Sequence, residues 1–122
     1  MILASFNHAQ FVEAAVRSVL DQTYKNVELI IVDDGSSDGT AEIIRQIADP
    51  RIKFYGMEKN RSVQVRNYGL RHAKGKFVAF QNSDDVWMPD KLFRQLEVME
   101  SQPDIQAVFT GVSFLDSCGL PS

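Results

Sequence analysis

The 122-residue chain carries 13 Lys and Arg against 16 Asp and Glu, a formal net charge of -3, and 44% of its residues are hydrophobic. This length suits one domain, and the acidic balance argues against a nucleic-acid binder, which usually presents a basic face. The single cysteine, Cys118, excludes a disulfide within the chain and a cysteine metal cluster. No apolar run approaches the roughly 20 residues that span a bilayer, so membrane association is expected only through parts outside this sequence.

Strand and helix signals alternate along the first half of the chain. Residues 2–5 predict a short strand, and apolar residues at helical spacing predict a helix over about residues 9–22. The apolar run at 27–33 indicates a buried parallel strand. A second helix follows. Its expected buried face carries Ile43, Ile44, Ile47 and Ala48, its start could be capped by Ser37, Asp38 or Thr40, and Asp49-Pro50 ends it.

The alternation continues with short links through the second half. It predicts a strand at 52–55, a helix at 63–73, a strand at 77–81, a helix with Pro89 in its first turn, and a fifth strand beginning at 107–109. Regular alternation of this kind is typical of an α/β domain with a mostly parallel sheet, flanking helices and right-handed crossovers. We therefore expect a single domain over residues 1–122.

Two acidic turns follow predicted strands: the first acidic turn, Asp33–Thr40, and the second acidic turn, Asn82–Asp85. In open α/β sheets, ligands bind just outside the carboxyl ends of the strands. The pair Asp84-Asp85 suits a hard divalent cation that shares its coordination shell with a diphosphate. Asp33 and Asp34 suit hydrogen bonds from a base or a ribose. Taken singly, the second turn is also consistent with a solvated acidic turn or with Asp85 as a helix cap, and the first favours an ordinary strand-to-helix turn.

Other residue types add less to the chemistry. Arg66 could bind phosphate. The rings of Phe6 and Trp87 could stack on a ligand, and for Trp87 packing in the core or at the lip of a site is the alternative. The two histidines, His8 and His72, lack metal-ligand spacing and suggest surface or capping roles. No Ser/His/Asp set, zinc spacing, phosphate loop or dinucleotide fingerprint is present.

Taken together, the motifs resemble those of family 2 glycosyltransferases of the GT-A fold, in order and with typical gaps from about residue 2 to residue 112. The segments that carry the resemblance are Ala4–Asn7, Ser18–Tyr24, Val32–Thr40, Val65–Leu70, Ala73–Lys76 and Ser83–Asp85. The resemblance implies a Rossmann-like nucleotide-diphospho-sugar transferase fold. It also implies a metal-dependent, inverting transfer of a sugar from a nucleotide sugar, with a UDP-sugar favoured, to a hydroxyl of a glycan or lipid-linked acceptor.

The resemblance also assigns site residues by position. Ala4 and Phe6 would line the nucleotide pocket, Asp34 would contact the base, and Asp33 would support it or the ribose. Arg66 matches a basic position near the donor. Asp84 and Asp85 match the acidic motif that binds Mn²⁺ or Mg²⁺, with Asp85 the expected direct ligand. Two positions depart from the pattern, because Phe6 stands where Tyr is common and Asn82 where Asp is common.

Family members generally continue past residue 122, and their later half supplies the acceptor site and the general base. The resemblance thus implies a C-terminally incomplete domain that holds the donor-binding half, with the base beyond residue 122. Such a chain should be catalytically silent and self-associating, and should reside in the cytoplasm or at the inner membrane face. The alternatives are a nucleotidyltransferase of similar fold and a non-catalytic nucleotide-binding or interaction module.

Overall fold

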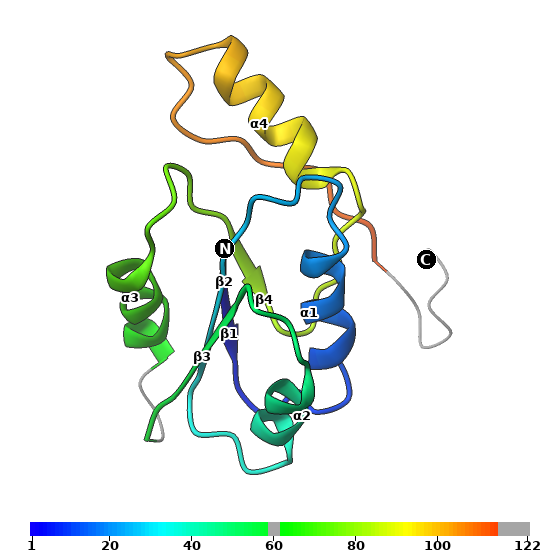
Figure 1. The fold of residues 1–122 in the computed structure, drawn as a ribbon, viewed down its shortest axis with the longest axis vertical. Coiled ribbons are helices and arrows are strands. Elements are labelled where there is room, and N and C mark those ends of the chain that lie inside the picture. The colour runs from blue at the N-terminus through cyan, green and yellow to red at the C-terminus, as the bar shows by residue number, and fades with distance from the viewer. Residues whose placement is uncertain (59–61, 115–122) are drawn as a thin grey trace.

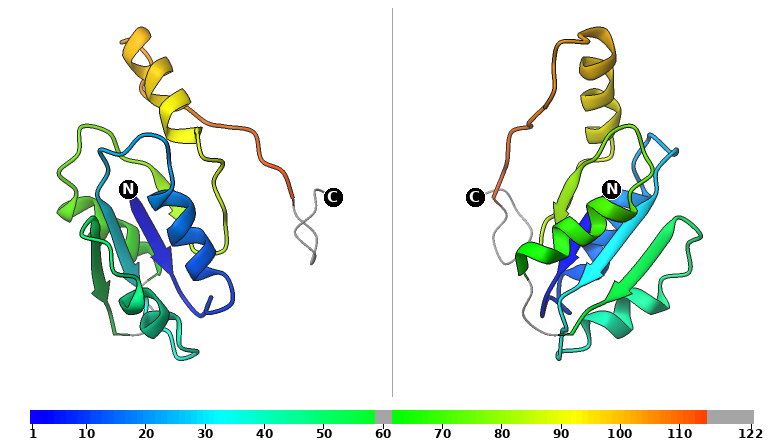
Figure 2. Two further views of the ribbon diagram at one scale, coloured as in Figure 1. Left: turned by 45° about the vertical axis from the view of Figure 1, so that its right-hand side comes forward. Right: turned by 90° about the vertical axis from the view of Figure 1, so that its left-hand side faces the viewer.

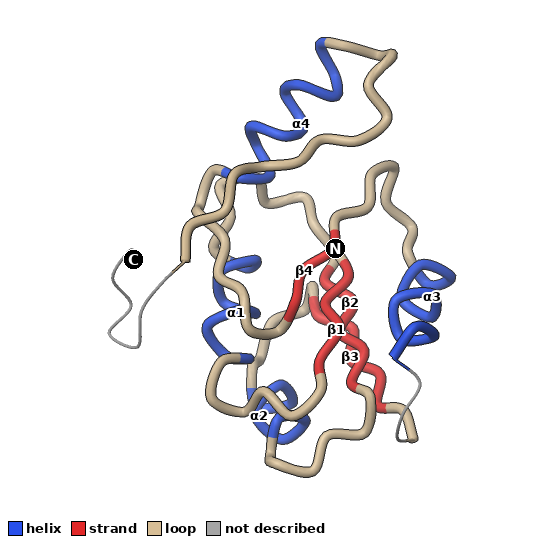
Figure 3. The backbone as a smooth tube through the Cα atoms, turned by 180° about the vertical axis from the view of Figure 1, so that it is seen from behind, coloured by secondary structure: helices blue, strands red, loops and turns tan. Residues whose placement is uncertain are grey.

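A parallel sheet forms the centre of the molecule. The computed structural model describes residues 1–58 and 62–114, and within these residues four strands pair in the order β3-β2-β1-β4. All three pairings are parallel, which confirms the predicted fold class (Figure 1 and Figure 3). The strands are β1 (Ile2–Ser5), β2 (Leu29–Asp33), β3 (Ile52–Gly56) and β4 (Phe80–Asn82).

Helices cover both faces of this sheet. α1 (Val12–Leu20) and α2 (Thr40–Gln46) lie together on one face, and α3 (Ser62–His72) lies on the other, against β1 and β2 (Figure 1 and Figure 2). Every residue of β2 is buried, as expected for a central parallel strand with helices on both sides. Because helices cover the two faces, a ligand can reach the sheet at the amino or the carboxyl ends of the strands.

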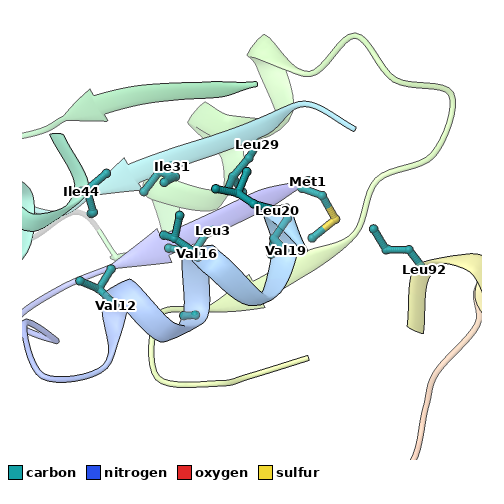
Figure 4. Close-up of a cluster of buried hydrophobic side chains, with 11 residues drawn as sticks. Met1, Leu3, Val12, Val16, Val19, Leu20, Leu29, Ile31, Ile44 and Leu92 are labelled. Atoms are coloured by element: carbon teal, nitrogen blue, oxygen red, sulfur yellow. The ribbon is translucent and has the colours of Figure 1, made fainter. Parts of the chain in front are cut away.

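The larger core lies between the sheet and α1. The buried residues of α1 recur at helical spacing and form one apolar stripe that packs on alternate residues of the strands. Figure 4 shows this cluster, which includes Val12, Val16, Val19, Leu3, Leu29, Ile31 and Ile44. A smaller core of Ile30, Val32 and Val65 fills the opposite face beneath α3. Buried apolar area of this kind is the main force that holds helices on a sheet.

Three helix boundaries differ from the expectation. α1 begins at Val12 rather than residue 9, because the N–H groups of Phe11 and Val12 both donate to the His8 carbonyl, each at 2.9 Å, and close a turn first. α2 ends at Gln46, since Ile47 already has extended backbone, so Ala48 is exposed and not on a buried face. Pro89 lies outside α4, which spans Lys91–Ser101.

The strand predictions failed at the far edge of the sheet. β4 covers Phe80–Asn82 rather than 77–81, because its register sets Phe80 opposite Ile2, the first residue of β1. The expected strand from 107 is wrong, since residues 102–114 contain no strand. This segment instead returns beside α4, where Gln95 Nε2 donates to the Val108 carbonyl at 2.9 Å (Figure 1). Phe109 is left 91% exposed.

α4 extends away from the sheet beyond the amino-terminal ends of the strands (Figure 2). Leu92 in its first turn is buried near Met1 (Figure 4), while the neighbouring Phe93 faces solvent. Among the described helices, none is long and apolar enough to cross a membrane.

Candidate functional site

The two acidic turns lie at the carboxyl edge of the sheet, on either side of β1. The register sets Ser5 opposite Asp33 and Ala4 opposite Asn82. From β1 the chain proceeds to β2 and β3 on one side and later returns to β4 on the other. The strand order therefore reverses beside β1. In open α/β sheets, the crevice outside the strand ends at such a reversal is where ligands bind.

Asp33 holds the first acidic turn closed. Its carboxylate is buried and accepts hydrogen bonds from Ser5 Oγ at 2.8 Å, Ser36 N at 2.9 Å and Ser36 Oγ at 2.5 Å. The turn also needs Gly35 and Gly39, whose φ values of 75° and 96° favour a residue without Cβ. With three donors on one carboxylate, Asp33 is suited to supporting the turn.

Asp34 and the ring of Phe6 lie at the same edge. Asp34 is buried, and its N–H donates to the Ser5 carbonyl at 2.9 Å, which ties the end of β2 to the end of β1. Phe6 follows Ser5 directly and is 45% exposed. An exposed ring beside a buried carboxylate offers a flat apolar surface and a hydrogen-bond acceptor, which together suit a nucleobase.

The turn between β1 and α1 is fastened to the first acidic turn by hydrogen bonds in both directions. The N–H groups of residues 7, 8 and 9 donate to side chains of that turn, and one N–H of the turn donates back. The pairs are Asn7 N to Ser36 Oγ, His8 N to Thr40 Oγ1, Ala9 N to Asp38 Oδ2 and Ser37 N to Asn7 Oδ1, each at 2.9 Å.

Asp38 also serves the start of α2. Its Oδ1 accepts from Thr40 N at 3.0 Å and from Thr40 Oγ1 at 2.5 Å, as in an Asx turn. The N-cap of α2 is Gly39, which has a left-handed backbone and no side-chain cap hydrogen bond, so none of the expected caps, Ser37, Asp38 and Thr40, occupies that position. The Thr40 hydroxyl, followed by the Ala9 N–H, holds the pKa of the Asp38 carboxyl below its ordinary value. Asp38 is thus kept anionic as a structural group.

The second acidic turn presents Asp84 and Asp85 to solvent. Asn82 Nδ2 donates to Asp85 Oδ2 at 3.0 Å, and Arg66 Nη2 of α3 donates to Asn82 Oδ1 at 2.9 Å. The structure therefore brings Arg66, Asn82 and Asp85 together. Sequence reasoning gave Asn82 little weight because it replaces the common acid, yet it is the residue that connects the arginine to the carboxylate.

The side chains of Gln81 in β4 and Gln22 after α1 hold the backbone around the second acidic turn by hydrogen bonds. Gln81 Nε2 donates to the Asp85 carbonyl at 2.8 Å and to the Ala15 carbonyl at 3.3 Å. Further along, Gln22 Nε2 donates to the Met88 carbonyl at 2.7 Å. His8 Nδ1 and the buried Ser83 Oγ are joined at 2.7 Å. This contact was missed in the sequence, where nothing marked His8 except its place in the turn after the first strand.

A divalent cation fits the second acidic turn by its donor chemistry. Asp84 and Asp85 offer adjacent, exposed carboxylate oxygens, the ligands that Mg²⁺ and similar hard cations prefer. No group of three or more His, Cys, Asp or Glu suited to a metal occurs in the described part of the chain. A cation here would take its remaining ligands from water and from phosphate oxygens.

The large cavity of the molecule does not coincide with these residues. It has a volume of about 950 Å³ and lies at the opposite end of the sheet, between the amino-terminal strand ends and α4, with Met1, Glu28, Lys74 and Leu92 in its wall.

Trp87 packs against the core, and Lys91 Nζ lies 4.1 Å from its ring centroid. Of the roles considered for Trp87, the structure shows core packing. The polar strand ends remain the candidate site.

Comparison with known sequences relates the whole chain to one family. The family described as Glycosyl transferase family 2 matches residues 1–119. The UDP-Glc:alpha-D-GlcNAc-diphosphoundecaprenol beta-1,3-glucosyltransferase WfaP of Escherichia coli is 42% identical over 84% of this chain and 41% of its own length. Three curated relatives at 40–43% identity are matched over 49%, 41% and 40% of their lengths. The chain thus spans less than half of each.

Solved structures with the same fold include two bound complexes. TarS 1-349 of S. aureus in complex with UDP superposes with a TM-score of 0.76 at 26% identity, over 84% of this chain and 32% of that one. The mannosyltransferase PcManGT from Pyrobaculum calidifontis in complex with GDP-Man and Mn²⁺ gives 0.75 at 26% identity, over 80% and 31%.

Proposed function

Since the chain belongs to glycosyltransferase family 2, we propose that it binds the nucleotide-sugar donor for metal-dependent, inverting transfer of a sugar to an acceptor hydroxyl. The observation that carries this proposal is the placement of two acidic turns on either side of β1 at the carboxyl edge of a parallel sheet. One turn is suited to a nucleoside and the other to a cation and a diphosphate.

The nucleoside is assigned to the first acidic turn. Asp34 would accept hydrogen bonds from the base, Ala4 and Phe6 would form the wall beside it, and Asp33 would hold the turn in shape through Ser5 and Ser36. A buried carboxylate discriminates strongly between ligands that can donate to it and those that cannot. UDP is the favoured nucleotide, because WfaP takes UDP-Glc by its name and TarS binds UDP.

Mn²⁺ or Mg²⁺ is assigned to the second acidic turn. Asp85 would be the direct ligand and Asp84 its neighbour, and such an ion supplies Lewis-acid stabilisation of the departing nucleoside diphosphate. The Mn²⁺ complex of PcManGT supports this assignment. Asn82 would orient the Asp85 carboxylate, and Arg66 would add a fixed positive charge next to it.

We place the acceptor site and the general base outside these 122 residues. Glu13, Glu42 and Glu97 lie on helices α1, α2 and α4, and the first two pair with Arg17 and Arg45 of the same helices. The relatives' greater length leaves room for the missing groups. A glycan or lipid-linked acceptor, such as the diphosphoundecaprenol substrate in the name of WfaP, would bring the reaction to a membrane surface.

Thermal melts with UDP test the metal role. With Mn²⁺ and UDP near 100 times the dissociation constant, binding should stabilise the fold by about 2.7 kcal/mol. EDTA should remove most of this shift, and so should Asp85→Asn, which keeps the size of the side chain and removes its charge. Asp104→Asn, at an exposed position beyond α4, is the matched control. An equal shift with and without EDTA would contradict the metal assignment.

Calorimetry with Asp34→Ala separates the two turns. This variant should weaken uridine binding and leave the affinity for free Mn²⁺ little changed, because Asp34 follows β2 and the metal pair follows β4. Loss of Mn²⁺ binding with intact uridine binding would reverse the two assignments.

A further inference from the structure

The turn between β1 and α1 touches both acidic turns through one residue. The His8 backbone N–H donates to Thr40 Oγ1 of the first acidic turn at 2.9 Å. Its ring nitrogen Nδ1 lies 2.7 Å from Ser83 Oγ of the second acidic turn. Backbone and side chain of a single histidine therefore connect segments that are more than 40 positions apart in the sequence.

Through Ser83, the contact with His8 acts on the position of the second acidic turn. Its side chain is 1% exposed, and it directly precedes Asp84. A buried hydroxyl requires a hydrogen-bond partner, so the position of Ser83 depends on where the His8 ring stands. The ring itself is fixed edge-on against Phe11, with centroids 6.1 Å apart and planes at 84°.

His8 adds little to the core. The side chain is half-buried and its packing partner Phe11 is 45% exposed. The backbone of the turn is already fastened to the first acidic turn by the N–H groups of Asn7 and Ala9. The imidazole is therefore not needed to hold that side together, and its contact acts on the other side, at Ser83.

We propose that His8 is a positioning residue that fixes the second acidic turn relative to the first, so that a nucleoside and a metal-bound diphosphate are held at one distance. This inference rests on the proposed function, because it concerns a ligand that engages both turns. A preorganised pair of subsites binds such a ligand more tightly than two subsites that move independently. Groups that orient metal ligands typically change metal affinity by about 10–100-fold when they are lost.

Four variants separate the contribution of the hydrogen bond between His8 and Ser83 from that of the packing of the His8 ring. His8→Phe keeps a ring against Phe11 and loses Nδ1, and Ser83→Ala removes the other partner. His8→Asn places an amide near the position of Nδ1 and should restore the bond. His72→Phe is the matched control, because His72 lies at the end of α3, with Nδ1 2.8 Å from the Tyr68 carbonyl.

Calorimetry measures the dissociation constants of UDP with Mn²⁺ and of uridine without metal. His8→Phe and Ser83→Ala should each weaken Mn²⁺-dependent UDP binding by about 10-fold or more. Uridine binding should be unchanged in both, and the double variant should be no weaker than either single one. His8→Asn and His72→Phe should bind UDP with Mn²⁺ as the unaltered protein does.

The outcomes separate this inference from the function on which it rests. If the unaltered protein binds UDP without any metal dependence, the proposed function fails and the inference fails with it. If the unaltered protein shows metal-dependent binding and His8→Phe matches it, the function stands and the positioning role is refuted. If His8→Phe loses uridine and UDP binding equally, together with thermal stability, His8 serves the fold and not the spacing.

Discussion

At the scale of single residues, the carboxylates Asp33, Asp84 and Asp85 of the candidate site differ in burial and in their hydrogen bonds. Asp33 is 2% exposed and accepts three hydrogen bonds, whereas Asp84 and Asp85 face solvent. Hydrogen bonds to charged groups stabilise a fold by about 1.5–3 kcal/mol each, and a buried donor left without its acceptor costs a similar amount. Among these three carboxylates, the buried and fully hydrogen-bonded Asp33 supports the turn, and the exposed Asp84 and Asp85 can contact a ligand.

We expect Asp33→Ala to lower the free energy of unfolding by about 2–4 kcal/mol, since Ser5 and Ser36 lose their shared acceptor. Asp84→Ala should change it by less than about 0.5 kcal/mol, as exposed substitutions usually do. Urea denaturation of both variants measures the difference. Equal stability of the two variants would show that the hydrogen bonds of Asp33 do not hold the turn.

At the scale of elements, the approach of α3 to β1 depends on Gly69. A Cβ built at this position would lie 2.6 Å from Ile2 Cγ2, a stiff, buried methyl group that cannot swing aside. Alanine normally stabilises a helix by about 1 kcal/mol relative to glycine. Here the overlap reverses the sign, because forced overpacking costs about 1–3 kcal/mol.

Gly69→Ala should thus destabilise the fold by about 1 kcal/mol despite its better helix propensity. Arg71→Ala, at an exposed position of the same helix, is expected to be close to neutral. Urea midpoints of the two variants decide the matter. A gain in stability from Gly69→Ala would mean that α3 can shift away from β1 at no cost.

An ion pair at the junction between α2 and β3 should make the stability of the fold depend on pH. The Arg51 guanidinium donates to both Asp49 oxygens, at 3.0 and 2.7 Å, and holds the pKa of Asp49 at about 2. Because this pKa is depressed in the folded state, the stabilisation is complete above pH 4 and is lost as the pH falls toward 2. Arg51 Nη1 also donates to the Leu20 carbonyl at 3.2 Å, so the pair fastens the end of α1.

Asp49→Asn should therefore be less stable than the unaltered protein at pH 6, and the gap should narrow between pH 4 and pH 2. The measurement is the urea midpoint of both proteins across this range. Asp104→Asn, an exposed change of the same kind, should show no such narrowing. A gap that stays constant down to pH 2 would show that the Asp49 charge does not contribute.

Elements that pack against the main core could be predicted from the sequence, and elements at the margins of the fold could not. β2 and α1 were predicted because an apolar run and a helical stripe report burial directly. Residues 107–109 carry the same apolar signal, yet no strand forms there, since strand pairing depends on which neighbour is available. Within the site, adjacent carboxylates after strands were visible, whereas the His8 to Ser83 contact depends on two loops meeting in space.

At the scale of the whole molecule, large apolar side chains are exposed on β4 and on the segment that follows α4. β4 is an edge strand, and Phe80 is 47% exposed on it. Phe109, Val112 and Phe114 add further exposed apolar side chains along the segment that follows α4. An open strand edge and large exposed apolar surface both promote contact with other chains. Two family relatives are more than twice as long as the part that this chain matches, which leaves further chain to cover such a surface.

The 122-residue chain on its own should self-associate and should not transfer sugar. Association follows from the exposed apolar surface, and light scattering at rising concentration should report a dimer or larger species.

The absence of sugar transfer follows because transfer to a hydroxyl needs a base within about 2.6–3.2 Å of the acceptor proton. The site carboxylates Asp34, Asp84 and Asp85 are assigned to the nucleoside and the metal. Acceptor-dependent release of UDP that is lost in Asp85→Ala would require a base among these residues, and a monomer at high concentration would contradict the association.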